Sequence, residues 1–459
     1  MSLRVVVVGG GLAGMAAAVA LESAGSQVTL IEARKTLGGR AGSFEDPQTG
    51  EILDNCQHVL LGCCTNLIDF YRRINVLDRI HWENTIHFVD SHGRPHELWG
   101  INGLPAPLNL AAAGGMFGAL SLMERLALAR AMLAMLRLGV AGREKLADLS
   151  FGQWLTDHAQ PASLIDKFYE LVLVSALNER CRDASAAYAI QVFQEGMLAH
   201  SSAYRMGTPA CPLGKLYETL PCRDVRLGAR MTSIQFDGPR AAGIELGGDS
   251  LKADAIILAV NYPALEKWIP PELSQLDSRF AGLDRLQSVP ILGAHLWFDR
   301  PVLSTPHAAL MGGPMQWLFR KPDSDGRAVH GVISAARDWV QRPKDECLEL
   351  FTRQIQNTFP EAKNAKLERG VIVVEKRATF SPSPGIDRFR PMQAPPPTGI
   401  AGLFLAGDYT RTNWPATMEG AVRSGYLAAE AVLAMPASFL VPDLPPQWPA
   451  KFLARQKNW

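Results

Sequence analysis

Residues 4–14, RVVVVGGGLAG, decide the fold of this chain. Four consecutive valines form an apolar run that is typical of a strand buried on both faces. Gly9, Gly11 and Gly14 then stand at G-x-G-x-x-G spacing, and residues 15–23 favour a helix. In such a unit the first glycine makes the tight turn, the second lets the backbone approach a pyrophosphate, and the third lets helix and strand pack closely. The stretch therefore predicts a dinucleotide site with its phosphates at a helix N-terminus.

The next two segments extend this prediction. Residues 27–31, QVTLI, form a second apolar run that ends at Glu32, eighteen positions after Gly14. A carboxylate at that place can accept hydrogen bonds from both hydroxyls of a ribose. Residues 37–42, LGGRAG, add a second glycine turn, and we expect Arg40 to lie near a phosphate or the ring of the same cofactor. A glycine hairpin with a solvated arginine is the alternative for this turn.

Composition sets the outer limits. The chain has 459 residues, enough for two or three domains, and 47% apolar with 20% charged residues is ordinary for a globular protein. A net charge of +1 without a Lys/Arg run argues against a nucleic-acid partner. Seven cysteines without a C-x-x-C pair predict neither a disulfide framework nor a metal site, which favours a reducing compartment. The first strand is too short for the apolar part of a signal peptide, so we expect no export signal.

The C-terminal part adds two further motifs. Residues 403–408, LFLAGD, read as a strand ending in Gly-Asp, and residues 413–421, NWPATMEGA, lead into a helix. Together with residues 9–14 (GGGLAG), 31–34 (IEAR) and 38–43 (GGRAGS), these motifs resemble the FAD-dependent amine oxidase and carotenoid desaturase superfamily. The resemblance implies FAD as the cofactor and a last strand that joins the first sheet.

The resemblance also implies roles for single residues. Asp408 would hold the ribityl chain, and the helix that begins at Met418 would point its N-terminus at the flavin pyrimidine, stabilising negative charge there. Residues 225–236 and 254–259 read as strands that return to the nucleotide domain. In relatives, a backbone group beside the position of Met231 contacts the adenine. The alternative for Met231 is a core residue without a role in binding. The residues that we expect to contact FAD are Gly9, Gly11, Leu12, Ala13, Gly14, Glu32, Ala33, Arg34, Gly39, Arg40, Met231, Gly407, Asp408, Thr417, Met418 and Ala421.

A narrower resemblance names a substrate. Residues 54–64 (DNCQHVLLGCC), 295–301 (HLWFDRP) and 375–380 (EKRATF) are similar to the hydroxysqualene dehydroxylases, a branch of the desaturase-like flavoproteins. This implies reductive removal of the hydroxyl of hydroxysqualene to give squalene, for squalene and hopanoid supply. Amine oxidases carry a lysine where this chain has Gly293 and an aromatic residue where it has Thr417, so amine oxidation fits poorly.

Dehydroxylation needs a proton donor, because hydroxide is a poor leaving group. The catalytic candidates are Asp54 and His58, with His295 as a further one; the alternatives are that Asp54 orders a turn or a cofactor hydroxyl and that His58 is a satisfied buried histidine. A hydrocarbon substrate requires a long apolar tunnel. Since no second dinucleotide turn is visible, an external electron donor must recharge the flavin. Small core residues, rather than nucleophiles, are expected at Cys56, Cys63 and Cys64.

The middle of the chain suggests contact with lipid. Residues 98–123 are uncharged, but their prolines and glycines make a poor continuous helix in a bilayer. Residues 124–138 read as a basic amphipathic helix with Arg130 and Arg137 on one face, which suits a membrane-surface contact or a lipid entry channel. A helical cap over the core is the alternative. The proline-rich tail, residues 436–459, packs on the body or touches lipid. We expect a cytoplasmic protein, peripheral on the inner face of the cytoplasmic membrane.

The predicted fold class is α/β: an FAD-binding, Rossmann-like doubly wound domain with an interleaved substrate domain of mixed sheet plus helices. The expected divisions are 1–70, 205–262 and 398–435 for the FAD domain, 71–204 for a largely helical substrate or membrane-facing region, 263–397 for the substrate sheet and 436–459 for the tail.

Two other functions stay open. An FAD-dependent desaturase of a polyene such as a phytoene-type carotenoid precursor would use the same fold with the electron flow reversed. A flavin-bearing isoprenoid carrier would bind lipid without chemistry. The oligomeric state is not predicted.

Overall fold

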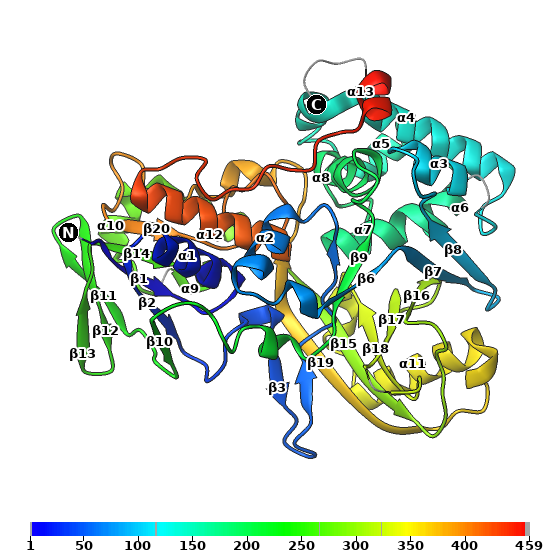
Figure 1. Ribbon diagram of the computed structural model, residues 1–459, viewed down its shortest axis with the longest axis horizontal. Helices are drawn as coiled ribbons and strands as arrows, with labels where there is room; N and C mark the ends of the chain where they lie inside the picture. The colour runs from blue at the N-terminus through cyan, green and yellow to red at the C-terminus, as the bar shows by residue number, and fades with distance from the viewer. Residues whose placement is uncertain (1, 115–116, 266, 323, 455–459) are drawn as a thin grey trace.

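The computed structural model describes residues 2–114, 117–265, 267–322 and 324–454 (Figure 1). A parallel sheet with its helices forms one end of the molecule, a larger mixed sheet lies at the other end, and a group of helices lies above the mixed sheet in this view.

The parallel sheet has the strand order β10-β2-β1-β14-β20, and every neighbouring pair is parallel. Its strands come from three separate parts of the chain. Their bounds are β1 Arg4–Val8, β2 Gln27–Glu32, β10 Asp224–Leu227, β14 Ala255–Leu258 and β20 Leu403–Leu405. The central strand β1 is buried on both faces, which explains why its sequence is an unbroken run of valines rather than an alternating pattern. The prediction that the last strand joins the first sheet is confirmed.

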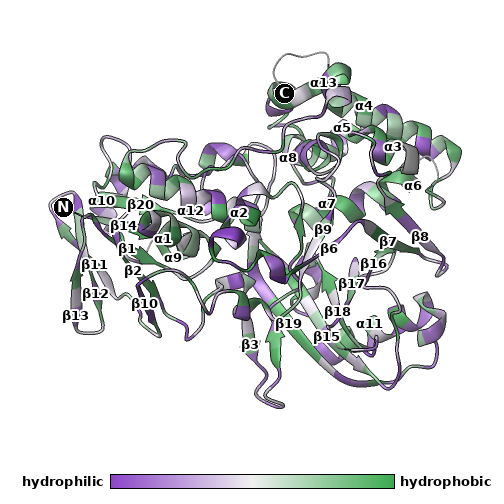
Figure 2. Cartoon of the chain, viewed as in Figure 1, coloured by the Kyte–Doolittle hydropathy of each residue, from purple (hydrophilic) through white to green (hydrophobic). Residues whose placement is uncertain are grey.

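Different layers cover the two faces of this sheet. Val5 and Val7 pack with helices α1 (Leu12–Ser23) and α12 (Met418–Leu433), which contact each other closely. Val6 and Val8 belong to the cluster on the other side, together with residues of an antiparallel meander. The meander consists of β11 Ser233–Asp237, β12 Arg240–Leu246 and β13 Asp249–Lys252. Because α1 packs both on the sheet and on α12, it is apolar along nearly all its length (Figure 2).

The mixed sheet has seven strands in the order β19-β15-β18-β17-β16-β7-β8, antiparallel except between β16 and β7. Helix α11 (Lys344–Thr358) covers one face, where it packs on Leu292 and Leu296 of β15. Alternate residues of β15 therefore face the opposite side, toward the parallel sheet's glycine turns. The strands are β7 Thr85–Asp90, β8 Pro95–Trp99, β15 Ser288–Phe298, β16 His307–Met311, β17 Trp317–Arg320, β18 Ala328–Ile333 and β19 Leu367–Phe380.

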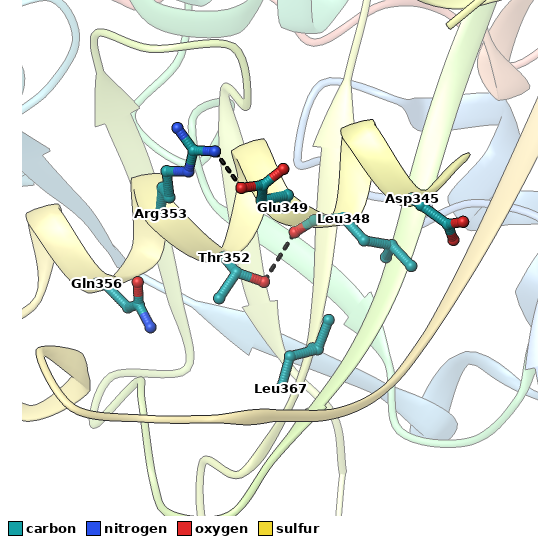
Figure 3. A pocket seen from close by; sticks show the side chains of 7 residues that line it. All are labelled: Asp345, Leu348, Glu349, Thr352, Arg353, Gln356 and Leu367. Carbon is teal, nitrogen blue, oxygen red and sulfur yellow. Dashed lines mark hydrogen bonds and ion pairs between the residues drawn. The ribbon is translucent and has the colours of Figure 1, made fainter. Parts of the chain in front are cut away.

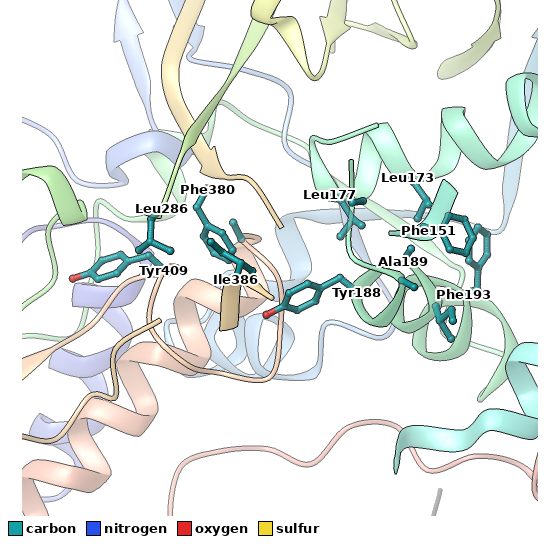
Figure 4. Close-up of a cluster of buried hydrophobic side chains, with 14 of the residues drawn as sticks. Phe151, Leu173, Leu177, Tyr188, Ala189, Phe193, Leu286, Phe380, Ile386 and Tyr409 are labelled. Atoms are coloured by element: carbon teal, nitrogen blue, oxygen red, sulfur yellow. The ribbon is translucent and has the colours of Figure 1, made fainter. Parts of the chain in front are cut away.

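The helical group shares its core with the nucleotide domain. Phe151, Tyr169 and Phe193 stack or meet edge to face, and the same buried cluster continues to Phe380 and Tyr409 (Figure 4). The group contains α3 Leu108–Gly114, α4 Leu122–Glu144, α5 Phe151–Asp157, α6 Ala162–Leu164, α7 Glu170–Leu177 and α8 Ala186–Phe193. The remaining strands and α-helices of the described residues are β3 Ser43–Glu45, β4 Ile52–Asp54, β5 Leu60–Leu61, β6 Ile80–Glu83, β9 Met206–Pro209, α2 Thr65–Arg73, α9 Tyr262–Leu265, α10 Pro271–Leu276 and α13 Trp448–Ala454.

The segment that is uncharged in the sequence, residues 98–123, does not form one helix. It contains the end of β8, helix α3 and the start of α4, and residues 115–116 lie outside the described residues. Among the residues that the structure describes, no helix is both long enough and apolar enough to span a bilayer. The helix expected over residues 124–138 is α4, which kinks at Gly139. Residues 455–459 of the predicted tail lie outside the described residues, and the domain divisions stay a prediction.

Candidate functional site

The three glycines of the first turn have different neighbours. A Cβ on Gly9, whose φ is +114°, would lie 2.4 Å from the Ala259 carbonyl oxygen, and a Cβ on Gly14 would lie 1.9 Å from the Gly9 oxygen. A Cβ on Gly11 would meet nothing within 4 Å. Packing thus requires glycine at the first and third positions, whereas the second faces open space. Gly11 is the N-cap residue of α1 and has no side chain that could accept a hydrogen bond from the helix. The amides of Leu12 and the first turn are therefore available to a phosphate.

The second glycine turn lies directly on the first. The Gly38 amide donates to the Gly10 carbonyl at 2.8 Å, and a Cβ on Gly39 would lie 3.1 Å from Gly11 Cα. Gly38 and Gly39 both have positive φ, at +107° and +58°. The two predicted backbone approaches to the cofactor therefore meet at one place.

Glu32 lies at the end of β2, beside this double turn. Its two carboxylate oxygens accept hydrogen bonds from the amides of Gly10 and Arg34, each at 2.7 Å. Each oxygen keeps a second acceptor position for a ribose hydroxyl. The Ala229 amide donates to the Glu32 carbonyl at 3.0 Å, so the segment that leads to Met231 passes the same edge. The Met231 side chain is buried in the core, and the adenine contact of its neighbouring backbone stays a prediction.

Arg40 and Asp408 join the two ends of the chain. They are 368 positions apart, and their side chains form a bidentate ion pair with N–O distances of 2.7 and 3.0 Å. Arg40 also donates to the Ala378 carbonyl of β19 at 2.6 Å. This contact brings the second glycine turn, the end of β20 and the mixed sheet together, which places Asp408 beside the turn that we expect to contact the flavin side of the cofactor.

The N-terminus of α12 is held rigidly. Thr417 caps it, since its hydroxyl accepts from the Gly420 amide at 3.0 Å. The fully buried Glu419 accepts from Asn66 Nδ2 at 2.9 Å and from Arg423 Nε at 2.7 Å. The first turn of α12, which contains Met418 and Ala421, is thus fixed by hydrogen bonds, and its contact with the flavin stays a prediction. Sequence reasoning missed Glu419, although the i, i+4 spacing from Arg423 could have indicated the pair.

Arg390 is a second residue that sequence reasoning missed. Its side chain is completely buried and donates to the carbonyls of Asp408, Tyr409 and Thr410. Its guanidinium also lies 4.9 Å from the centre of the Phe380 ring. Arg390 therefore holds the loop that carries Asp408, and no local motif marks it.

The candidate acids Asp54 and His58 are not on a helix, since Asp54 ends β4 and His58 follows in a loop. Asp54 Oδ1 accepts from the Ser43 hydroxyl at 2.6 Å and from the Leu213 amide at 3.0 Å. Desolvation raises the pKa of Asp54 and lowers that of His58. The Cys56 carbonyl can only accept, so His58 Nδ1–H donates to it at 2.9 Å and leaves Nε2 as the titrating nitrogen.

This loop lies against the cofactor turn. Asn55 Nδ2 donates to the Gly39 carbonyl at 3.2 Å. On its other side the loop meets the mixed sheet, where a Cβ on Gly293 would lie 3.5 Å from the Asn55 carbonyl oxygen and 2.8 Å from His330 Nε2. The structure therefore brings Asp54 and His58 next to the cofactor turn and leaves no room for a lysine at Gly293 without displacement of His330.

His295 and His330 form a buried pair beneath the loop. Their ring centres are 3.9 Å apart, and His295 Nε2–H donates to the Asp54 carbonyl at 2.9 Å. Burial lowers the pKa of His295 to about 4 and lowers that of His330 as well. Both rings are neutral at physiological pH, and the proton of His295 Nε2 is already engaged by a backbone carbonyl.

The cysteines of the same stretch are buried or half-buried, and burial raises the pKa of Cys56 to about 12. A thiol with so high a pKa is not a nucleophile at neutral pH. This agrees with the expectation of core residues.

A surface groove of about 500 Å³ lies between α11 and the start of β19, which contributes Leu367 (Figure 3). Its lining is mostly polar or charged and includes an ion pair between Glu349 and Arg353. Helix α11 stands on the far face of the mixed sheet from the glycine turns. The groove is thus separate from the site described above.

The residues present fit a dinucleotide cofactor. Gly11 leaves an open approach at a helix N-terminus that no side chain caps, and Glu32 offers acceptors at the end of β2. Next to Asp408, the Gly407 amide donates to the Ser424 hydroxyl of α12 at 2.8 Å.

Comparisons with known proteins agree with this geometry. A sequence profile of flavin containing amine oxidoreductases matches residues 12–433. The 15-cis-phytoene desaturase of Synechococcus elongatus is 28% identical over 94% of this chain and 96% of its own length. The hydroxysqualene dehydroxylase of Zymomonas mobilis is also 28% identical, over 93% of this chain and 98% of its own length.

Solved structures support the fold. A putrescine oxidase with bound putrescine has a TM-score of 0.68 at 17% identity and covers 95% of this chain and 99% of its own. An oxidoreductase from Methanosarcina mazei has a TM-score of 0.69 at 16% identity, over 94% of this chain and 100% of its own. The predicted α/β class and FAD cofactor are thereby confirmed. With a family profile over most of its length and a cradle suited to the dinucleotide, the chain belongs to the flavin containing amine oxidoreductases and is an FAD-dependent oxidoreductase.

Proposed function

We propose that this protein removes the hydroxyl group of hydroxysqualene and releases squalene and water. The observation that carries the proposal is the position of residues 54–64, which resemble the hydroxysqualene dehydroxylases and lie against the Gly39 turn through Asn55. The dehydroxylase of Zymomonas mobilis matches this chain over 98% of its own length. This chain has Gly293 at the position where amine oxidases carry a lysine, so it lacks one feature that amine oxidation would use.

The proposed reaction divides between the cofactor and the chain. Bound FAD in its reduced form supplies the hydride that replaces the hydroxyl group. The chain must hold a proton for the departing oxygen, and Asp54, whose pKa desolvation raises, is suited to retain one. His58 is the second candidate through Nε2.

The chain must also keep water away from the reacting carbon. Cys56, Met206, Phe319 and Val332 form a small buried apolar cluster beside the same loop. Such a surface suits a hydrocarbon, whose binding energy comes from apolar area removed from water. We propose this cluster as the inner wall of the substrate site.

A single-turnover experiment tests the proposal. FAD-loaded enzyme is reduced without oxygen and mixed with hydroxysqualene, and the flavin spectrum and the extracted lipids are followed together. We expect reoxidation of the flavin in step with squalene formation. Reduced flavin that persists in the presence of hydroxysqualene contradicts the proposal.

The desaturase alternative rests on the equal identity to the cyanobacterial enzyme. It predicts that oxidised enzyme is reduced by a phytoene-type polyene. The carrier alternative predicts bound isoprenoid with no substrate-dependent change in the flavin spectrum.

We also propose an external electron donor for the flavin and a peripheral position on the inner face of the cytoplasmic membrane. The substrate class supports this position, since a C30 hydrocarbon alcohol partitions into bilayers.

A further inference from the structure

The most exposed large apolar side chains gather on two helices. Within the described residues, the four highest exposures belong to Phe452 at 77%, Leu122 at 70%, Met123 at 69% and Trp448 at 68%. The first turn of α4 carries two of them, and α13 carries the other two. Isolated exposed apolar residues need no explanation, but a group on neighbouring elements does.

The two helices are neighbours. Helix α13 packs on α4 through its buried residues Pro449, Ala450 and Ala454, while Trp448 and Phe452 lie on its opposite side. The Gln447 amide donates to the Ala199 carbonyl at 2.8 Å, which anchors the start of α13 to the helical group. In Figure 1 both helices lie along the upper edge of the molecule.

Before the kink of α4 at Gly139, the exposed charges on these two helices are positive, whereas Glu144 at the end of α4 is an exposed acid. From Leu122 to Ala141, Arg130 and Arg137 are exposed on α4, and Lys451 is exposed on α13 between the two aromatic residues. In the described part of the chain, none of these three cations forms an ion pair with an acidic side chain. The one acid in that part of α4, Glu124, is buried and bound to Lys167.

Apolar side chains interspersed with unpaired cations are complementary to one kind of surface. An anionic bilayer offers negative headgroups to the cations and, a few ångströms deeper, an apolar phase to the aromatic and aliphatic side chains. A protein partner would have to bury three cations and supply acids for each of them.

We propose that the outer faces of α4 and α13 form a docking surface for an anionic phospholipid bilayer. Leu122, Met123, Trp448 and Phe452 enter the boundary between headgroups and acyl chains, and the three cations bind lipid phosphates. This inference rests on the membrane contact proposed above and names the surface that makes it.

Vesicle flotation of the full-length, FAD-loaded protein tests the surface. We expect binding to phosphatidylcholine vesicles that contain roughly one third phosphatidylglycerol, weak binding to phosphatidylcholine alone, and release at about 0.5 M salt. The double variant Trp448→Ser/Phe452→Ser should bind at least about tenfold more weakly. The double variant Arg130→Gln/Arg137→Gln should lose about 30-fold on anionic vesicles and little on neutral ones.

The matched control is Leu227→Ser/Leu276→Ser, which changes two apolar residues of 46% and 55% exposure at the other end of the molecule. The control should bind like the unchanged protein, and equal losses in control and docking variants would overturn the proposal. So would an absence of vesicle binding combined with self-association that Trp448→Ser/Phe452→Ser abolishes, because a second copy would then cover the surface.

Turnover of hydroxysqualene in detergent separates this inference from the proposed function. The docking variants should convert detergent-dispersed substrate at the unchanged rate. If the protein binds vesicles as expected but does not convert hydroxysqualene, the proposed dehydroxylase function is contradicted and the docking surface is not. If the protein converts hydroxysqualene in detergent but neither double variant weakens vesicle binding, the docking surface is contradicted and the function is not.

Discussion

At the scale of single residues, space decides which glycines the cofactor cradle needs and for what reason. Gly14 has no room for a Cβ because the Gly9 carbonyl fills it, whereas Gly11 has room that the protein itself does not use. The same contrast appears at Gly293, whose missing side chain leaves space that His330 occupies. Stability and ligand binding can therefore be separated by substitutions three positions apart.

We expect Gly14→Ala to destabilise the fold by about 1–3 kcal/mol, because α1 must move away from the turn. Gly11→Ala should leave the unfolding temperature of the cofactor-free protein unchanged and weaken FAD binding, because the methyl group stands in the open approach. Thermal unfolding and flavin absorbance of the purified variants measure the two effects. Normal FAD affinity in Gly11→Ala would contradict the assignment of the phosphate site.

Asp54 and His58 can be distinguished by conservative substitution. If Asp54 holds the proton, Asp54→Asn should slow flavin reoxidation by hydroxysqualene about 100- to 10,000-fold while FAD content stays normal. His58→Gln then has a small effect, and the reverse result identifies His58. Ser43→Ala serves as a control, since it removes the 2.6 Å hydrogen bond to Asp54 but leaves the carboxyl group.

The buried histidines predict a loss of stability in mild acid. An unfolded histidine titrates near pH 6.5, but burial lowers the pKa of His295 to about 4 in the folded protein. Between these values the unfolded chain takes up a proton that the folded chain does not, so stability is full above pH 6.5 and falls as the pH drops toward 4. The contribution of His295 to the loss reaches about 3 kcal/mol at the lower end.

Urea unfolding at about pH 7 and about pH 5 measures this loss. His295→Gln should reduce the difference between the two pH values, and the exposed His92→Gln should not. An unchanged pH dependence in His295→Gln would show that other groups cause the acid sensitivity.

At the scale of elements, the loops after the strands carry the chemistry, and buried polar side chains hold them. Arg390 holds the loop after β20 through three carbonyls, and Glu419 fixes the N-terminus of α12 against Asn66 of α2. The loop after β4 is fixed by Asn55 on one side and by His295 on the other. Glu419 and His295 reach partners 353 and 241 positions away, so these loops depend on the tertiary fold for their shape.

Arg390→Lys should be strongly disruptive although it keeps the charge. An ammonium group has three donors at one point and cannot reach the carbonyls that the guanidinium spans, and leaving buried acceptors unpaired costs about 1–3 kcal/mol each. We expect a lower unfolding temperature together with weaker FAD binding. Arg388→Lys, at an exposed ion pair with Asp148, should change neither quantity, and equal behaviour of the two variants would be evidence against the anchoring role.

At the scale of the whole molecule, the cofactor cradle is an assembly of chain segments. Arg40 and Asp408 meet across 368 positions, and the helical group shares one buried cluster with the nucleotide domain. Cofactor binding is therefore expected to stabilise both ends of the chain at once rather than one local motif.

Adding FAD to cofactor-free protein should protect residues 9–14, 38–43 and 406–421 together from hydrogen exchange. At a free concentration 100-fold above Kd the folded state should gain about 2.7 kcal/mol. Exchange mass spectrometry measures the protection by peptide. Protection confined to residues 9–14 would mean that the C-terminal segment does not contact the cofactor.

The sequence alone was sufficient for the parts of this protein that depend on local chemistry. Gly9, Gly11 and Gly14, the valine strand before them and the acid at Glu32 are close in the chain, and their spacing reflects the geometry of one turn. The Gly-Asp at residues 407–408 was recognisable for the same reason, and from these motifs the α/β class and the FAD cofactor followed.

Tertiary structure alone decided what surrounds those motifs. Arg390, Glu419 and His295 act through Asp408, Asn66 and Asp54, which lie 18, 353 and 241 positions away. No periodicity in the sequence marks contacts between such separate segments. The outer face formed by α4 and α13 arises in the same way, because α13 packs on a helix that begins more than three hundred positions earlier. Local patterns encode turns and helices, whereas burial depends on which distant segments come to cover them.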